Sequence, residues 1–256
     1  AQMVFDGQRQ FCILFGGDGL RSQGVRLGWL TPAPWYSEVL LGAQNATGET
    51  VVSFLGEEGA EVGGHELQEQ RPRNFTDLLY SLRWLNGCDL SETVSANIGV
   101  SGLWGPNATG ADTNTTIYGA DLFVKWQAAR SQRGFPFVAW HTEYLQREYE
   151  AGDSGDPGRE TLDDDGLFSQ VLWGFKPGWV AGLRWEFAQG DGASEGDPLR
   201  ETRRRLSPNL TWYPTEFSKL RIQYNRDWAG FVDGGSADSL WMQVEFGLGA
   251  HAAHTF

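Results

Sequence analysis

The sequence predicts an all-β protein that folds as an antiparallel up-and-down transmembrane β-barrel with about 11–12 visible strands. Apolar and polar residues alternate over long stretches, which gives a strand one apolar and one polar face. The chain contains 12 Trp, 15 Phe and 34 Gly, a composition that favours strands joined by tight turns over helices. Short and long connections alternate along the chain, as they do in bacterial outer-membrane barrels.

The C-terminal stretch 240–256 carries the clearest alternation. Every second residue from Leu240 is apolar with one exception, and the intervening residues are mostly small or polar. This stretch is longer than the roughly 3–10 residues of an ordinary soluble strand. It ends on the aromatic residue Phe256, and we expect it to close the sheet.

Ten further alternating segments precede it. We expect the eleven strands at residues 25–29, 35–43, 78–85, 92–104, 118–126, 138–147, 167–175, 179–187, 206–212, 220–224 and 240–256. Short turns are expected at Thr31, Asn86, Gln127, Pro177 and Pro214, where Pro and Asn-Gly interrupt the pattern.

Longer loops are expected between the hairpins. Residues 45–76 form the longest, in which the apolar patch 51–55 extends a strand edge. A strongly acidic loop spans residues 150–166 and includes Asp163, Asp164 and Asp165. The last loop is expected at residues 227–239.

Residues 25–256 are therefore assigned to the barrel, and residues 1–24 to a loop and the remnant of an earlier strand at 5–15. Eleven strands is an odd number, whereas bacterial single-chain barrels have an even number. We therefore expect either a twelfth strand or an N-terminally truncated piece of a larger barrel.

Composition excludes several classes. A formal charge of −13 argues against nucleic-acid binding, which needs a basic surface. No run of about 18 apolar residues is present, so a membrane helix is not expected. The mean hydropathy of −0.40 resembles that of a soluble protein, but barrel strands carry apolar residues only at alternate positions. Cys12 and Cys88 are too few to define a disulfide framework or a metal site.

Two alternatives remain open. A soluble β-sandwich that binds carbohydrate through exposed Trp also has alternating strands, but most segments here have the length of about ten residues that a tilted membrane strand needs. The second alternative is an outer-membrane barrel with a structural or enzymatic role. His141 and Glu143 share a polar face without an evident Ser nucleophile, so we expect no enzyme. The four His residues are not grouped, and we expect no metal and no cofactor.

The polar faces would line a lumen. Its basic residues would be Arg26, Arg83, Lys125, Arg147, Lys176, Arg184, Arg205, Lys219 and Arg221. Its acidic residues would be Glu38, Asp121, Glu143, Glu186 and Glu245. This excess of cations would favour anions. The alternative is that these charges form ion pairs across neighbouring strands inside a packed, hydrated interior.

Two stretches, 24–49 and 246–256, resemble Gram-negative outer-membrane proteins. The chain is similar to the family labelled zinc-regulated TonB-dependent outer-membrane receptor, which is related to phosphate-selective porin-like barrels. The resemblance implies a cell outer-membrane location, contact with outer-membrane lipid and lipopolysaccharide, and assembly by the barrel assembly machinery reading Phe256. It implies a porin-like channel or uptake protein for small, anionic solutes, and it is compatible with an oligomer.

Overall fold

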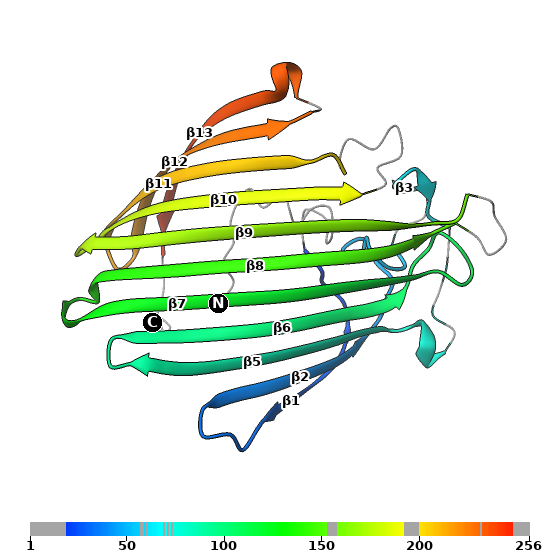
Figure 1. The fold of residues 1–256 in the computed structure, drawn as a ribbon, viewed down its shortest axis with the longest axis horizontal. Coiled ribbons are helices and arrows are strands. Elements are labelled where there is room, and N and C mark those ends of the chain that lie inside the picture. Colours follow the sequence, from blue (N-terminus) through cyan, green and yellow to red (C-terminus); the bar gives the residue numbers. More distant parts are fainter. Residues whose placement is uncertain are drawn as a thin grey trace.

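The computed structural model describes residues 19–56, 59, 61–68, 70, 72, 74–152, 158–191, 200–230 and 232–247. Eleven strands form one antiparallel sheet, in which each strand pairs with the sheet strand before and after it in sequence (Figure 1). The expected all-β class, the antiparallel up-and-down order and the eleven strands are confirmed. The expected strand remnant at 5–15 and the terminal Phe256 lie outside the described residues.

The strands of the large sheet run along the whole described chain. Their bounds are β1 Gly24–Leu30, β2 Tyr36–Gln44, β5 Leu79–Ser91, β6 Val94–Pro106, β7 Asn114–Gln132, β8 Phe135–Ala151, β9 Glu160–Lys176, β10 Trp179–Asp191, β11 Arg203–Thr215, β12 Ser218–Ala229 and β13 Ser236–Phe246. A small separate hairpin consists of β3 Glu61–Val62 and β4 His65–Glu66, and two 3-10 turns lie at η1 Phe75–Asp77 and η2 Asp233–Gly235.

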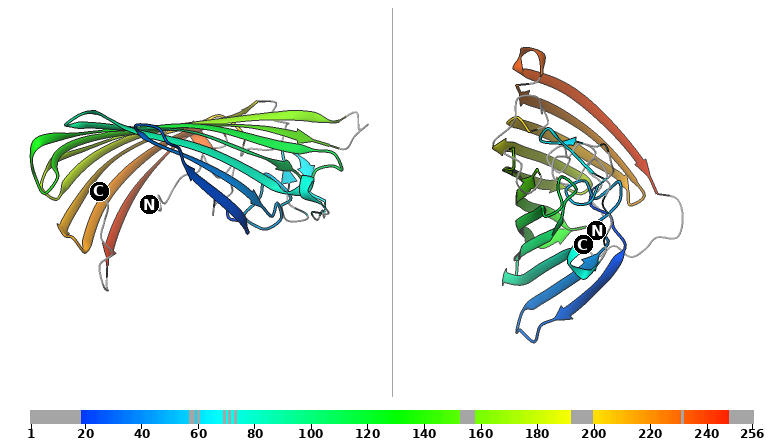
Figure 2. Two further views of the ribbon diagram at one scale, coloured as in Figure 1. Left: turned by 90° about the horizontal axis from the view of Figure 1, so that it is seen from below. Right: turned by 90° about the vertical axis from the view of Figure 1, so that its right-hand side faces the viewer.

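The sheet keeps one apolar face from edge to edge. Leu41 on β2 lies opposite Leu27 on β1 and Leu82 on β5, and the same parity continues across the other strands. These side chains are exposed, for example 54% for Trp173 and 75% for Met242. We call this the outward face. The sheet is strongly curved, and the segment that carries β3 and β4 lies on its concave side (Figure 2).

The connections alternate in length, as expected. Short turns occupy residues 31–35, 92–93, 133–134, 177–178 and 216–217 at one end of the sheet, and longer connections lie at the other end. In the Pro177-Gly178 turn, Gly178 has a φ of +78°, a conformation that side chains with a Cβ rarely adopt. We call the two ends the short-turn end and the long-loop end.

Three of the expected short turns lie elsewhere. Asn86 and Gly87 belong to β5, where they pair with β2 and β6. The pairing continues because Gly87 has no side chain, and a Cβ there would lie 2.5 Å from Oδ1 of Asn97. Gln127 lies within β7 and Pro214 within β11, so the turns follow them at 133–134 and 216–217.

Strands β7, β8 and β9 are the longest, with 19, 17 and 17 residues. The prediction that Asp163, Asp164 and Asp165 lie in the loop 150–166 is therefore wrong, because these three residues belong to β9. The outward apolar positions of β9 run only from Leu167 to Phe175, close to the roughly 9–11 residues of a tilted membrane strand. Beyond Leu167 the outward positions are polar, so the strands extend past the apolar band.

The expected loop 227–239 is also shorter. β12 continues to Ala229 and β13 begins at Ser236. Asp227 is therefore a strand residue, held opposite Arg205 on β11.

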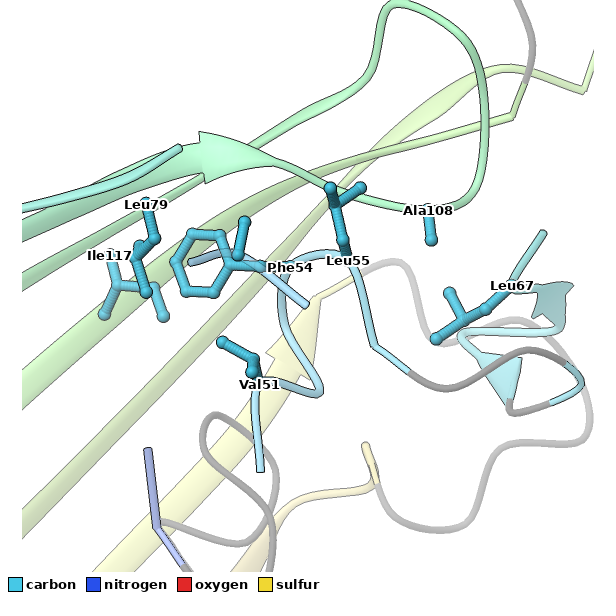
Figure 3. Packing of buried hydrophobic residues seen from close by; sticks show 8 residues of the cluster. Val51, Phe54, Leu55, Leu67, Leu79, Ala108 and Ile117 are labelled. Carbon is cyan, nitrogen blue, oxygen red and sulfur yellow. The ribbon is translucent and has the colours of Figure 1, made fainter. Parts of the chain in front are cut away.

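The segment 45–78 packs against the concave side of the sheet instead of extending a strand edge. Val51, Phe54 and Leu55 are buried with Leu79 of β5 and Ile117 of β7 (Figure 3). The expectation that residues 51–55 extend a strand edge is therefore wrong. Their apolar side chains form the largest buried cluster of the described residues, and we call 45–78 the inward segment.

β1 and β13 are the two edges of the sheet, and within the described residues each pairs with one neighbour only. With eleven strands in alternating directions, β1 and β13 run in the same direction. None of the helices in the described part of the chain is long and apolar enough to cross a membrane.

If the outward face contacts lipid, Val171→Arg places a charge in the middle of the apolar band. We expect the free energy of unfolding in phospholipid vesicles to fall by about 2–4 kcal/mol, measured by denaturant titration. Thr161→Arg, on the same face of β9 but beyond the band, is the control and should change it little. Equal stability of the two variants would contradict a lipid-facing surface.

Candidate pore-lining face

The inward face of the sheet carries the charged residues expected to line a lumen. It is formed by the positions that alternate with the outward apolar residues, so the same register that aligns one face aligns the other. At one level across the sheet, Asp121, Glu143, Phe168 and Glu186 follow one another on β7 to β10. Arg205 and Asp227 continue this row on β11 and β12.

Most of the basic residues in this face are paired. Arg83 lies 2.8 Å from the carboxylate of Asp121 two strands away, and Arg205 lies 2.6 Å from that of Asp227. Two further pairs join Arg184 to Glu186, at 2.5 Å, and Lys219 to Glu245. The structure therefore supports the alternative in which lumenal charges pair across the wall.

The other predicted cations have different neighbours. Lys125 lies 5.7 Å from the ring centre of Phe137, and Lys176 lies 5.0 Å from that of Trp179. Arg221 donates a 2.9 Å hydrogen bond from Nε to Oγ1 of Thr211. The contacts of Lys125 and Lys176 with aromatic rings stabilise a cation without neutralising its charge.

Three predicted residues lie outside this pairing. Arg26 is exposed on the edge strand β1. Glu38 accepts a 2.6 Å hydrogen bond from the hydroxyl of Tyr36. Glu143 sits between Asp121 and Phe168 in the register of the sheet.

An aromatic track crosses the inward face. His141 contacts Phe168 edge to face at 4.9 Å and Phe123 at 6.1 Å, and the guanidinium of Arg184 lies 4.5 Å from the ring centre of Phe168. Neither Phe123 nor Phe168 was among the predicted pore-lining residues, although both lie on the inward parity of their strands.

A buried ionic network lies on the inward side near the long-loop end. Asp164 of β9 accepts hydrogen bonds from Arg147 of β8, at 2.9 Å from Nε, and from Arg200 before β11, at 2.8 Å. Arg147 also donates to Oγ of Ser53 in the inward segment, at 2.8 Å. All three charged side chains are at most 2% exposed, so Arg147 is part of a packed network and not an exposed lumenal cation.

Four residues of these networks were missed from sequence. Asp164 and Asp227 continue the inward parity of β9 and β12, so extending the alternation through the presumed loops would have found them. Arg200 and Ser53 lie outside the large sheet, and no periodic signal marks them. With Asp164 and Asp227 included, the inward acids largely balance the cations.

The inward segment is held at several further points. His65 lies 3.2 Å from the carboxylate of Glu160, and the backbone N–H of Gln68 donates to the carbonyl of Ala108 at 2.8 Å.

Tyr149 is fully buried beside Leu162, beyond the apolar band. Burial raises the pKa of Tyr149 above its ordinary value, and the nearby guanidinium of Arg147 opposes that rise only in part.

Within the part of the chain that the structure describes, no three His, Cys, Asp or Glu side chains form a group that could hold a metal ion. Cys88 is exposed and free.

Comparison with known proteins adds little to this geometry. No family model matches the chain. It is 28% identical to an uncharacterized protein of Aquifex aeolicus (strain VF5). The alignment of 261 residues covers 95% of this chain and 53% of that protein. The chain thus spans about half the length of the curated relative it matches.

Among solved structures, one described as a NanC porin in a rhombohedral crystal form matches with a TM-score of 0.42 and 13% identity, covering 88% of this chain and 99% of that one. A similarity of this size does not carry a functional assignment. Neither comparison supports the TonB-dependent receptor or phosphate-porin label, which stays a proposal.

The pairing across β11 and β12 can be measured by a double-mutant cycle of Arg205→Gln and Asp227→Asn. Both side chains are less than one third exposed, so we expect a coupling energy of about 1–2 kcal/mol from denaturant unfolding. Arg226 and Asp238, 42% and 51% exposed, form the control pair, which should couple by at most about 0.5 kcal/mol. Equal coupling in the two pairs would contradict a structural role for the inward pair.

Proposed function

We propose that this chain forms the wall of a transmembrane β-barrel channel for small solutes. One observation carries the proposal: the register of the sheet holds an exposed apolar face on one side and a charged, polar face on the other across all eleven strands. A membrane barrel needs this arrangement, because lipid contacts one face and water or solute the other. In a soluble sandwich the apolar face would be covered by a second sheet, and the described residues contain no such layer on that face.

The membrane in question is proposed to be the Gram-negative outer membrane. Short connections at one end and long ones at the other fit the periplasmic and extracellular sides of such barrels. Outer-membrane lipid and lipopolysaccharide would then be the partners of the outward face. The same proposal includes assembly by the barrel assembly machinery, which would read Phe256. It also includes an oligomeric state and membership of the TonB-dependent receptor or phosphate-porin families.

The inward segment would narrow the channel. Its apolar cluster packs on Leu79, Leu103 and Ile117, all inward residues near the long-loop end. A solute entering from that side would therefore pass residues 45–78 before reaching the rest of the inward face.

The preference for anions is the finer part of the proposal. Near the long-loop end and at the middle of the wall, cations are balanced by Asp121, Asp164, Glu186 and Asp227. Nearer the short-turn end, the ammonium group of Lys125 lies over the ring of Phe137, and Arg221 places a second positive charge on the same inward face. This half of the lumen would carry the excess positive potential that attracts anions.

A soluble carbohydrate-binding domain is the second candidate, favoured by the exposure of Trp29, Trp173 and Trp241. Trp241 alone of these lies on the inward parity, whereas Trp29 and Trp173 lie among aliphatic residues of the outward face. Partition into detergent and heat-modifiable gel mobility would favour the barrel, and a water-soluble monomer would favour the binding domain.

The channel is tested by reconstituting the protein in planar bilayers and recording single-channel currents in a KCl gradient. We expect discrete conductance steps and a reversal potential that shows a higher permeability for chloride than for potassium. The absence of steps would contradict the channel.

Charge reversal tests the anion preference separately. Lys125→Glu combined with Arg221→Glu should lower the chloride-to-potassium permeability ratio several-fold, because both side chains lie on the inward face. Arg204→Glu makes the same substitution on the outward face of β11 and should leave the ratio unchanged. A ratio unaffected by the double reversal would remove the anion preference but not the channel.

A further inference from the structure

We propose that Asp164 is a positioning residue for the channel constriction: its buried carboxylate holds the inward segment against the wall through Arg147 and Ser53. This proposal rests on the proposed channel function for its consequence, but the attachment itself can be tested without it. Asp164 contacts no solute in this proposal, and acts through the segment that it holds.

Four parts of the chain meet in the network around this carboxylate. Arg147 comes from β8, Asp164 from β9, and Arg200 from the connection between β10 and β11. Both guanidinium groups bond the carboxylate, one oxygen each. Ser53 of the inward segment then accepts a hydrogen bond from the same Arg147.

The chemistry explains why a carboxylate occupies this position. Two buried guanidinium groups without an anion between them would repel each other and lose solvation. Asp164 keeps them together, and the planar, fixed geometry of Arg147 lets it bond Asp164 with one side of the guanidinium and Ser53 with another. Asn at position 164 keeps the size of the side chain but not the charge.

Two glycines leave room for this arrangement. Gly190 lies directly opposite Asp164 in the pairing of β9 and β10. A Cβ on Gly190 would lie 2.5 Å from Oδ1 of Asp164 and 2.9 Å from Nε of Arg200. Gly63 of the inward segment, at a φ of +59°, packs against Leu162 two residues before Asp164. The wall and the segment are therefore fitted to each other around the network.

The position of the network makes it a point of attachment distinct from the apolar cluster. Val51 and Phe54 pack on β5 and β7, whereas Ser53 between them bonds to β8. Losing the ionic network would release the part of the segment around Ser53 from β8, although His65 would still contact Glu160 of β9. Residues 51–55 would then keep only their apolar contacts and would move away from β8, while the sheet kept its own pairing.

The test measures the accessibility of the inward segment. In a protein in which Cys12 and Cys88 are replaced by Ser, Val51→Cys places a buried probe next to Ser53. We expect Asp164→Asn to increase the rate at which a membrane-impermeant maleimide labels this probe at least tenfold. The matched control is Asp163→Asn, the same change of charge one residue away on an exposed side chain, which should change the rate less than twofold.

Heat-modifiable gel mobility of each variant shows whether the barrel is intact. If Asp164→Asn fails to fold, Ser53→Ala replaces it, because this change removes the hydrogen bond from Arg147 and leaves the buried charges in place. It should raise the labelling rate several-fold with unchanged mobility. Equal labelling of the Asp164→Asn and Asp163→Asn proteins, or of Ser53→Ala and the unmodified segment, would overturn the proposal.

Single-channel recording separates this proposal from the channel itself. Faster labelling with larger or noisier conductance supports both. Faster labelling without conductance in any variant supports the attachment and overturns the channel. Conductance steps with labelling that does not respond to Asp164→Asn or Ser53→Ala support the channel and overturn the attachment.

Discussion

The structure depends on one constraint, the strict alternation of side chains held in register from β1 to β13. A shift of one residue in any strand would turn its whole apolar set to the other face. The irregularities of the pairing are confined accordingly: they lie at Asp89/Ser91, Gln127/Gln132, Trp179/Val180 and Trp212/Thr215, all next to short turns. The middle of every pairing is regular, so each outward residue in these paired regions faces outward residues on the neighbouring strands.

The alternation is also why the fold could be predicted while the strand ends could not. A turn signal such as Asn86-Gly87 reports local conformational preference, but pairing with two neighbouring strands overrides it. An acidic run such as Asp163 to Asp165 reads as a solvated loop, yet the strand continues through it once the outward side no longer has to be apolar. Packing of Val51 and Phe54 depends on contacts with β5 and β7, which no local pattern contains.

The same extension of the strands changes the electrostatics of the inward face. Counting charges over the predicted strands alone leaves an excess of cations, because Asp164 and Asp227 are placed in loops. Once these residues join the wall, they neutralise Arg147 and Arg205. Paired charges act as dipoles whose field falls off faster than that of single ions. The net field along the lumen would then be set by the few cations without a nearby carboxylate, such as Lys125.

The edges of the sheet limit how such a wall can close. In lipid, every backbone N–H and C=O must be bonded within the protein, so an open edge is not tolerated. β1 and β13 run in the same direction, and direct contact between them would be parallel. A second copy related by an axis along the barrel would meet the first in the same parallel way. An antiparallel membrane barrel that contains these eleven strands therefore needs an odd number of additional strands between β13 and β1, and this requirement follows from the direction of the edges alone.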